Sequence, residues 1–356
     1  MGMNREFQVV HVKADTPKER GRQYGEQAAD KILAGVENYR QYFEKSRGYS
    51  WDETKAYAAA YIPVIEKMMP EVLEEARGIA EGAGTGLEEL MVLNTRYELT
   101  QYPSKLPECT TAAVLPEASA DGGTYLIKNW DYRPGVLDKI VLVHLEDEKG
   151  TRILGLTEAG QLIREGFNSN GVGLCNNMIQ SIYDTAGSGI PVTFLRRRVL
   201  ASSCFEEAYG WLVHAARCVS NNMLLVDGKH GRAVDIEAYP GGHDEIYPRD
   251  GIVAHANHFV VHPAIDALKS RPKNRDSRLD YLLRTHRGKI DPDCIKECMK
   301  DHEYYPEAIC NHSNHPGEDP MKGLMTVASI IVDFQKQQAH VCYGNPCEGQ
   351  YKVYDL

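Results

Sequence analysis

A thiol at the start of a strand-like run is the first feature of this sequence that could do chemistry. Cys109 stands in the stretch "PECTTAAV", after a proline and before two threonines and an apolar run typical of a strand. A cysteine can attack a carbonyl carbon when a base or a lowered pKa activates the thiol and when donors stabilise the oxyanion. Cysteine is also common as a small buried core residue. By type and position alone, Cys109 is either a nucleophile or part of the core.

Two polar side chains in neighbouring strand-like segments could complete such a site. In "GGTYLIKNWDY", the two-residue alternation of a strand places Asn129 and Asp131 on one face. Asn257 stands in "AHANHFVVHP", where its carboxamide could donate to an oxyanion. Each residue also has a structural interpretation, because Asp131 could cap the turn at "WDYRPG" and Asn257 could form a turn. The residue types leave both interpretations open.

The composition excludes several classes of partner. The chain has 356 residues, a formal net charge of −10 and 25% charged residues, with the basic ones scattered. The single basic run, residues 196–198, falls in a helical pattern and is expected to be a solvated face. No apolar run approaches a membrane span, and the first residues lack the apolar segment of a secretory signal. We therefore expect a cytoplasmic protein with neither nucleic acid nor membrane as a partner.

The nine cysteines are dispersed over a long chain. This usage is typical of reduced thiols and not of a disulfide framework. Cys175, Cys204 and Cys218 have apolar neighbours and are expected to be core residues.

The predicted elements change in kind at Cys109. Periodic apolar residues predict helices over residues 16–43, 70–84 and 86–99, the first with Thr16 as its cap. Short β-rich segments then alternate with turn residues, and helices return at 190–216, 276–288 and 291–303. The 190–216 segment contains an apparent capping box from Ser203 to Glu206, Asp291 caps the last helix, and residues 325–346 predict a hairpin. The pattern indicates one α+β domain, residues 1–356, with layered antiparallel sheets.

The segment "ECTTAAVLP…GGTYLIKNWDY" resembles the acyl-coenzyme A:isopenicillin N acyltransferase family of N-terminal-nucleophile hydrolases. That family shows Cys-Thr-Thr or Cys-Thr-Ser followed by Asn-Trp-Asp, and here Asp131 lies 131 − 109 = 22 residues after Cys109. The segments "GFNSNGVGLCNN", "HANHF", "NRDSRLDYLL", "ICNH" and "TVASIIVDF" resemble later family segments in the same order. The resemblance implies an αββα sandwich of two antiparallel sheets between helical layers.

The resemblance also implies self-cleavage. The thiol of Cys109 would attack the carbonyl of Glu108 and release a helical chain, 1–108, and a catalytic β-rich chain, 109–356. The new α-amino group, with a reference pKa of about 7.7–8.0, could then serve as the general base. The change from helical to β-rich pattern falls at this same bond. Known members carry Gly before the nucleophile, and Glu108 departs from that pattern.

Further roles follow from the resemblance, each with a structural alternative. Asp131 would hold Cys109 in place, and Asn257 would stabilise the oxyanion. Supporting or substrate-binding roles would fall to Lys128, Asn129, Asn176, Asn177, Arg278 and Ser329. Arg278 is equally interpreted as a surface charge at a helix start, and Ser329 as a buried strand residue.

The implied reaction is cleavage of a linear amide in a small molecule through a thioester on Cys109. The acyl group would pass to water or to an amine, and hydrolysis needs no further site. The reaction requires neither a cofactor nor a metal, although a coenzyme A thioester could serve as the acyl donor by family analogy. The expected partners are the substrate and the two self-cleaved chains, and a homo-oligomer is left open.

Two other interpretations compete with this one. A zinc-binding protein could use cysteines and histidines of the last third of the chain, namely Cys294, Cys298, Cys310, His312, His315, Cys342 and Cys347. Their spacing matches no tight zinc motif, so we predict no metal site. A cysteine hydrolase that never cleaves itself could instead pair Cys109 with His255 or His258.

Overall fold

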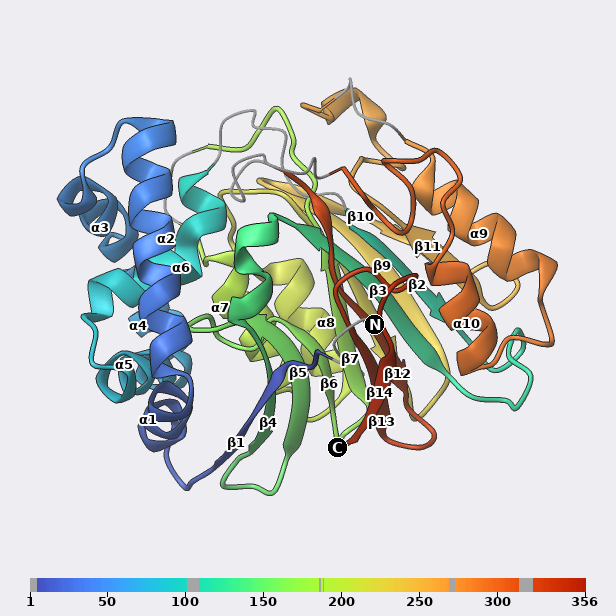
Figure 1. Ribbon diagram of the computed structural model, residues 1–356, viewed down its shortest axis with the longest axis horizontal. Helices are drawn as coiled ribbons and strands as arrows, with labels where there is room; N and C mark the ends of the chain where they lie inside the picture. Colours follow the sequence, from blue (N-terminus) through green and yellow to red (C-terminus); the bar gives the residue numbers. More distant parts are fainter. Residues whose placement is uncertain (1–4, 101–108, 186, 188, 269–272, 314–322) are drawn as a thin grey trace.

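Two β-sheets face each other between two layers of helices in the computed structural model (Figure 1). The structure describes residues 5–100, 109–185, 187, 189–268, 273–313 and 323–356. This arrangement confirms the α+β sandwich predicted from the sequence. No helix in these described ranges is both long enough and apolar enough to cross a lipid bilayer.

The first sheet has eight strands, and the β-rich part of the chain supplies seven of them. Their order is β1 (Gln8–Lys13), β4 (Ile140–Glu146), β5 (Arg152–Glu158), β6 (Glu165–Asn168), β7 (Val172–Asn177), β8 (Asn221–Asp227), β9 (Arg232–Tyr239) and β10 (Gly242–Ile246). Edge strand β1 runs parallel to β4, with Gln8 opposite Val141, and the other neighbours are antiparallel. The sheet therefore takes one strand from the N-terminal segment that the sequence pattern marked as helical.

The second sheet has six strands and carries Cys109 at the start of an inner one. Their order is β11 (Ile252–His255), β2 (Thr110–Val114), β3 (Tyr125–Tyr132), β12 (Met325–Asp333), β13 (Gln338–Tyr343) and β14 (Tyr351–Asp355). All neighbours are antiparallel, and β12 and β13 form the predicted hairpin. Since Thr110 pairs with Asn129, Cys109 comes directly before the register of β2 begins.

The helices divide between the two outer faces (Figure 1). On the eight-stranded side lie α1 (Pro17–Gln27), α2 (Ala29–Arg47), α3 (Trp51–Ala59), α4 (Ile62–Met68), α5 (Pro70–Ala83), α6 (Leu87–Leu99), α7 (Val192–Leu200) and α8 (Phe205–His214). On the six-stranded side lie α9 (Arg275–Thr285) and α10 (Pro292–Met299). Short 3-10 helices span η1 (Pro134–Lys139) and η2 (Pro263–Ile265).

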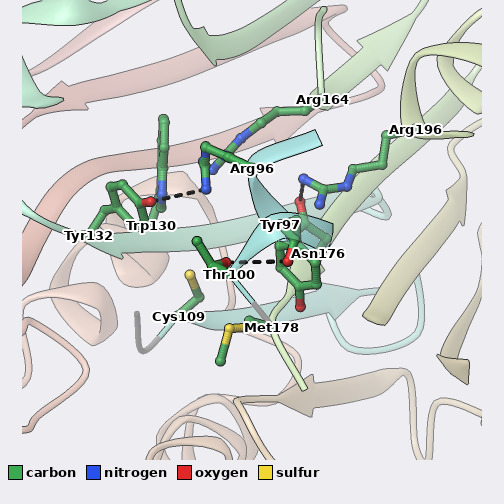
Figure 2. Close-up of a pocket in the computed structure, with 10 residues that line it drawn as sticks. All are labelled: Arg96, Tyr97, Thr100, Cys109, Trp130, Tyr132, Arg164, Asn176, Met178 and Arg196. Carbon is green, nitrogen blue, oxygen red and sulfur yellow. Dashed lines mark hydrogen bonds between the residues drawn. The ribbon is translucent and has the colours of Figure 1, made fainter. Parts of the chain in front are cut away.

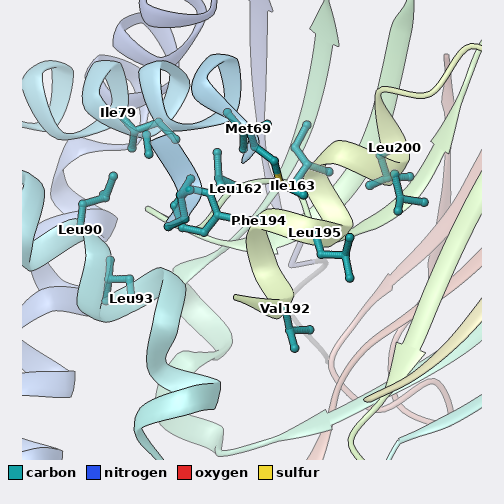
Figure 3. Packing of buried hydrophobic residues seen from close by; sticks show 14 of the residues in the cluster. Met69, Ile79, Leu90, Leu93, Leu162, Ile163, Val192, Phe194, Leu195 and Leu200 are labelled. Atoms are coloured by element: carbon teal, nitrogen blue, oxygen red, sulfur yellow. The ribbon is translucent and has the colours of Figure 1, made fainter. Parts of the chain in front are cut away.

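Strand alternation distributes the apolar residues among three cores. In β4, Val141 and Val143 pack under the large helical layer, whereas Leu142 packs between the sheets. Figure 3 shows the helical core, in which Phe194 and Leu195 of α7 lie near Met69. The third core joins the six-stranded sheet to α9 and α10. The space between the sheets is therefore walled off from solvent on both faces, and it holds the site.

Two predicted helical segments are interrupted. The segment 16–43 begins as expected, with Thr16 accepting from the Glu19 N–H at 3.2 Å, but breaks at Ala28 into α1 and α2. The segment 190–216 breaks after α7, and the predicted capping partner is wrong. Ser203 Oγ and its N–H both donate to Glu207 at 2.8 Å, whereas Glu206 pairs with Arg232.

The prediction that residues 196–198 form a solvated face is wrong. Arg196 and Arg197 are buried, and only Arg198 is partly exposed. Arg197 makes a two-bonded ion pair with Glu75 of α5, with Nε–Oε1 at 2.9 Å and a second nitrogen to Oε2 at 2.7 Å. The partner is 122 residues away, so no local pattern could reveal it.

The cysteine predictions are confirmed in part. Cys175 and Cys218 are buried, but Cys204 is exposed at the start of α8, so its assignment to the core is wrong. The cysteines are unpaired in the structure, as the reduced thiols predicted from the sequence would be. Asp291 caps α10 as predicted, accepting from the Cys294 N–H at 2.8 Å.

Candidate active site

Cys109 lies at the mouth of the space between the two sheets. Its side chain is 5% exposed and belongs to the inter-sheet core together with Trp130. The Sγ atom is 3.8 Å from the main-chain oxygen of Asp131. Burial raises the pKa of this thiol above its ordinary value, and the positive charge of Lys128 opposes that shift. The thiol is therefore protonated at neutral pH and needs a base before it can attack.

A pocket opens at Cys109 and is lined mainly by cationic and aromatic side chains (Figure 2). Its other lining residues are Arg96, Tyr97, Thr100, Trp130, Tyr132, Arg164, Asn176, Met178 and Arg196. Figure 2 shows the three arginines on one side of the pocket and Cys109 with Met178 on the other. The free volume of about 30 Å³ holds one or two water molecules. Side chains that line the pocket must therefore move when a substrate binds.

The three arginines lie against aromatic rings, and two of them, Arg96 and Arg164, also lie near carboxylates. Arg96 donates to the Tyr132 hydroxyl at 3.0 Å, and Arg164 lies 3.8 Å from the centre of the Trp130 ring. Arg196 donates to Asn176 Oδ1 at 3.0 Å. The Nε atoms of Arg96, Arg164 and Arg196 are buried and find no hydrogen-bond partner among the described residues. The pocket is therefore rich in positive charge and in unused donors.

Burial lowers the pKa of Arg196, and its two arginine neighbours lower it further, to about 9. A guanidinium with this pKa remains charged at neutral pH. In the described part of the chain no carboxylate forms a salt bridge with Arg196, whereas Arg96 lies 3.6 Å from Glu158 and Arg164 lies 3.9 Å from Glu165. Arg196 is thus the cation in the pocket that an incoming anion would most stabilise.

Asn257 binds the backbone of Cys109. Its Oδ1 atom accepts a hydrogen bond from the Cys109 N–H, and its Nδ2 atom donates to the main-chain oxygen of Met178 at 2.8 Å. Buried Arg275 donates to the same Oδ1 atom at 3.1 Å. The nitrogen that Asn257 holds is the one that would become the α-amino group if the chain were cut before Cys109.

The arginine that reaches the site is Arg275 and not Arg278. Arg278 lies one turn later on α9 and forms a two-bonded, partly exposed ion pair with Asp301, at 2.6 and 3.1 Å. Both residues stand in "NRDSRLDYLL", so the sequence located the helix but not the side chain that faces inward.

The Asp131 side chain is buried and is bound by Thr326 of β12, and Asn129 anchors a different part of the fold. Asp131 Oδ1 accepts from the Thr326 hydroxyl at 2.7 Å. Asn129 Nδ2 donates to the main-chain oxygens of Met299 and Ile309, at 3.0 and 2.8 Å. Asn129 therefore joins β3 to the end of α10 and to the segment after it, and it does not line the pocket.

Lys128 is fully buried between the sheets. Its ammonium group pairs with Glu165 of β6 and donates to the main-chain oxygen of Asn176 at 2.8 Å. Because the strand alternates, Lys128 faces the inter-sheet space that contains the Cys109 thiol, opposite to Asn129. Its positive charge acts on the Cys109 thiol, although Lys128 does not line the pocket.

The remaining predicted residues have different surroundings. Asn176 lines the pocket, whereas Asn177 bridges the sheets by donating to Thr111 at 2.7 Å and to Asn222 at 2.8 Å. The Ser329 hydroxyl bonds to that of Tyr351 at 2.7 Å, across the strands at the far side of the six-stranded sheet. Glu108 lies outside the described residues.

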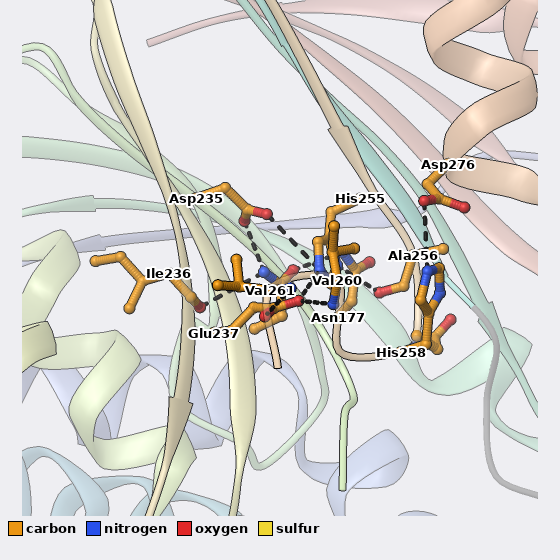
Figure 4. Close-up of polar contacts among 12 residues, drawn as sticks. Asn177, Asp235, Ile236, Glu237, His255, Ala256, His258, Val260, Val261 and Asp276 are labelled. Carbon is orange, nitrogen blue, oxygen red and sulfur yellow. Dashed lines mark hydrogen bonds and ion pairs between the residues drawn. The ribbon is translucent and has the colours of Figure 1, made fainter. Parts of the chain in front are cut away.

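His255 belongs to a buried polar network and does not pair with the thiol (Figure 4). Its Nε2 atom lies 2.8 Å from Glu237 and its Nδ1 atom 2.8 Å from the main-chain oxygen of Ala256. Burial alone lowers the pKa of His255, but Asp235 and Glu237 outweigh it and raise the pKa to about 9. His258 lies 3.5 Å from Asp276. A charged imidazole with both nitrogens engaged cannot act as the base of a Cys–His pair.

The family model described as acyl-coenzyme A:6-aminopenicillanic acid acyl-transferase matches residues 118–348. The chain belongs to this family. It is 24% identical over 344 residues to the 40 kDa form of acyl-coenzyme A:6-aminopenicillanic-acid-acyltransferase from Emericella nidulans. That alignment covers 95% of this chain and 93% of the relative. The chain is thus an acyltransferase or amidohydrolase family member along almost its whole length.

Solved structures similar to this family member include an amidase and a hydrolase. One is an N-acylethanolamine-hydrolyzing acid amidase ortholog from Caenorhabditis elegans, with 16% identity, a TM-score of 0.45, and coverage of 64% of this chain and 93% of that one. The other is a variant of the conjugated bile acid hydrolase from Clostridium perfringens, with 15% identity, a TM-score of 0.48, and coverage of 70% and 97%.

Sequence reasoning missed the arginines that shape the pocket of this acyltransferase family member. Arg96 is on α6, Arg164 precedes β6 and Arg196 is on α7, so three distant segments supply them. Arg196 stands in a basic run, which by itself is typical of a solvated helix face. The apolar residues on both sides of that run could have indicated burial of the arginines, because they leave few positions of the helix to face solvent.

Proposed function

We propose that this protein is a self-processing cysteine amidohydrolase or acyltransferase that forms a thioester on Cys109. The observation that carries the proposal is the Cys109 thiol in the lining of an arginine-rich pocket, with its own backbone N–H bound by Asn257. The thiol and the scissile nitrogen are thus presented on one residue, which an N-terminal nucleophile requires.

Self-cleavage would use the same atoms as the later reaction. The Cys109 sulfur adds to the Glu108 carbonyl carbon, the C–N bond breaks, and the nitrogen takes a proton and becomes the α-amine. Water then hydrolyses the thioester, which leaves a carboxylate on residue 108 and a free thiol on Cys109. The chains 1–108 and 109–356 would stay together, because β1 pairs with β4 and the helical core joins both chains.

Processing would also switch the catalyst on. In the uncut chain the Cys109 nitrogen is an amide and cannot accept a proton. After cleavage it is an amine with a reference pKa of about 7.7–8.0, and it can remove the proton from the thiol whose pKa burial raises. The thiolate attacks the substrate amide, the ammonium returns the proton to the leaving amine, and water or another amine takes the acyl group from sulfur.

The pocket favours substrates with an anionic group. Arg96, Arg164 and Arg196 line it, and each has a buried Nε without a partner among the described residues. A carboxylate bound there would satisfy these donors and neutralise charge, which makes N-acyl amino acids and similar acidic amides the favoured class. A coenzyme A thioester, as in the name of the Emericella nidulans relative, is the corresponding donor for acyl transfer.

Intact-mass measurement of the wild type and of Cys109→Ala tests the proposal. We expect the wild type to yield two chains that meet between residues 108 and 109, and Cys109→Ala to remain one inactive chain. Cys175→Ala is the matched control, because Cys175 is also buried in the inter-sheet core but has no proposed role. Cleavage of Cys109→Ala at the same bond would refute self-processing, and full activity of that variant would refute the thioester.

The substrate class is tested separately, with the processed wild type. N-acyl amino acids with a free carboxylate should be cleaved with a higher kcat/KM than the same compounds as carboxamides. Arg196→Met should remove most of this preference while leaving the Cys109 bond to residue 108 cleaved. Equal kcat/KM values for acids and carboxamides in the wild type would refute the anionic substrate class. This result would not bear on the role of Cys109 as the nucleophile.

A further inference from the structure

Four metal-ligating side chains meet beyond the end of α10, in a part of the molecule that the proposed reaction does not use. His302, Cys310 and His312 belong to the segment after α10, and Cys347 lies in the turn between β13 and β14. Their ligand atoms all lie within 4.8 Å of one another. We propose that His302, Cys310, His312 and Cys347 form a tetrahedral zinc site that joins these two segments.

The distances between the ligand atoms match those of a tetrahedral site. Nε2 of His302 and Nε2 of His312 are 3.2 Å apart, and the two sulfurs are 3.5 Å apart. His312 Nε2 lies 3.4 Å from the Cys310 sulfur and 3.3 Å from the Cys347 sulfur. Zinc bonds of about 2.3 Å to sulfur and about 2.05 Å to nitrogen require tetrahedral edges of about 3.8, 3.6 and 3.3 Å for S–S, S–N and N–N. These four distances need to lengthen by only about 0.1–0.3 Å to reach those edges, and the His302 nitrogen lies within 4.8 Å of each sulfur.

The backbone of the segment brings the three local ligands together. The Cys310 N–H donates to the Asp301 oxygen at 3.0 Å, and the His312 N–H donates to the Pro306 oxygen at 2.9 Å. The segment between them therefore folds back on itself and turns Cys310 and His312 toward His302. Residues 303–309 separate His302 from Cys310 in the sequence, so the two ligands meet only because the backbone folds back between them.

Asn345 supports one of the sulfurs. Its Nδ2 atom donates to the Cys310 sulfur at 3.5 Å and to the Asn311 main-chain oxygen at 2.7 Å. N–H donors of this kind stabilise a thiolate and orient a ligand. Asn345 is 4% exposed and lies two residues before Cys347, so it holds the ligand pair across the two segments.

The ligand types favour zinc among the common metals. Two thiolates with two imidazoles suit zinc, whereas magnesium and calcium prefer oxygen ligands. Binding releases one proton from each thiol, so Zn²⁺ with two thiolates and two neutral imidazoles has no net charge. Four protein ligands leave no position for water or substrate, which is typical of a structural site and not of a catalytic one.

The site would support Asp131 of the candidate active site. Asn311, between two ligands, exchanges bonds with Thr326, since the Asn311 N–H donates to Thr326 Oγ1 at 2.9 Å and the Thr326 N–H donates to the Asn311 oxygen at 3.0 Å. The same Thr326 hydroxyl donates to Asp131. Zinc would therefore fix the segment that positions this carboxylate.

This proposal differs from the sequence-based prediction of no metal. The zinc alternative considered from the sequence did not include His302, and His315 lies outside the described residues. Cys294 and Cys298 gather with His286 into a separate group of three, apart from the four-ligand group. Cys294 and Cys298 thus provide a matched control for thiol substitution near α10.

The test is metal analysis of the untagged full chain, purified with a phosphine reductant and a small excess of zinc and then desalted. We expect one zinc per chain, with X-ray absorption showing two sulfur and two nitrogen neighbours at about 2.3 and 2.0–2.1 Å. Cys310→Ser/Cys347→Ser should lose the zinc, and Cys294→Ser/Cys298→Ser should keep it. Asn345→Ala should weaken zinc binding by about 10–100-fold.

Several outcomes would overturn the proposal. These are wild type without zinc, loss of zinc from Cys294→Ser/Cys298→Ser but not from Cys310→Ser/Cys347→Ser, and an absorption spectrum dominated by oxygen neighbours. A Cys310–Cys347 disulfide in reduced, zinc-exposed protein, seen by non-reducing peptide mapping, would also overturn it. If the double variant does not fold, the wild-type X-ray absorption spectrum and the tetrahedral bands of cobalt-loaded protein decide the question.

Discussion

The buried pair of Lys128 and Glu165 gives the sharpest energetic test of how the site is built. Both side chains are fully buried, and Lys128 also donates to the Asn176 main-chain oxygen at 2.8 Å. Lys128→Met leaves the Glu165 carboxylate buried without its close ion pair, with the nearest Arg164 nitrogen 3.9 Å away. Removing one partner of a buried pair costs about 3–5 kcal/mol, so we expect a loss of free energy of unfolding in that range.

Replacing both partners should recover most of this loss. Lys128→Met/Glu165→Leu leaves no unpaired charge, and buried pairs replaced by apolar residues of similar size are often neutral in stability. We therefore expect a coupling energy of about 3 kcal/mol or more between the two sites. The measurement is urea unfolding of the four proteins of the cycle, each in the Cys109→Ala background, in which the proposed self-cleavage would not occur.

Two results would refute this reasoning. A cost below about 1 kcal/mol for Lys128→Met would show that the pair is not desolvated as the structure implies. A double variant as unstable as the sum of the single variants would show that the two groups do not interact. A second readout uses proteins that retain the thiol. Because Lys128 opposes the effect of burial on Cys109, Lys128→Met should shift the pH profile of Cys109 alkylation to higher pH.

Two further predictions concern stability. In Gly78→Ala the new Cβ would lie 1.9 Å from the main-chain oxygen of Lys18, so α1 and α5 must separate, and we expect a loss of more than about 3 kcal/mol by urea unfolding. Gly210→Ala in α8 is the matched control, because nothing lies within 4 Å and the change should stabilise by about 0.5–1 kcal/mol; similar effects of both variants would contradict the close helix contact. Two buried carboxylates raise the pKa of His255 from 6.5 to about 9, so its contribution is full below pH 6.5 and is lost as the pH rises through 9. The free energy of unfolding of the wild type minus that of His255→Gln should fall by about 3 kcal/mol over this range, and a pH-independent difference would refute the charged imidazole.

Local patterns were sufficient for several of the secondary-structure elements. The strand after Cys109, the helix cap at Asp291 and the hairpin over residues 325–346 each depend on residues close together in the chain. The alternation of β3 placed Lys128 and Asn129 on opposite faces, and their hydrogen bonds agree. These predictions held because hydrogen bonding within a turn, a cap or a strand is set by neighbouring residues.

The charges inside the molecule could be placed only by its tertiary structure. A basic helix run reads as solvated until the partner of Arg197 is found on α5, 122 residues away. The choice between Arg275 and Arg278 depends on which side of α9 faces Asn257, and the pocket combines arginines from three separate segments.

The sequence by itself determined that a strand follows Cys109 in a layered α+β fold, and that the chain belongs to a family of acyltransferases. Only the tertiary structure decided which charges surround that thiol and that His302, Cys310, His312 and Cys347 converge on one point. The physical reason is the separation along the chain of the residues that interact. Secondary structure follows from contacts between near neighbours, whereas a buried charge or a metal ligand requires partners that the folded chain brings from distant positions.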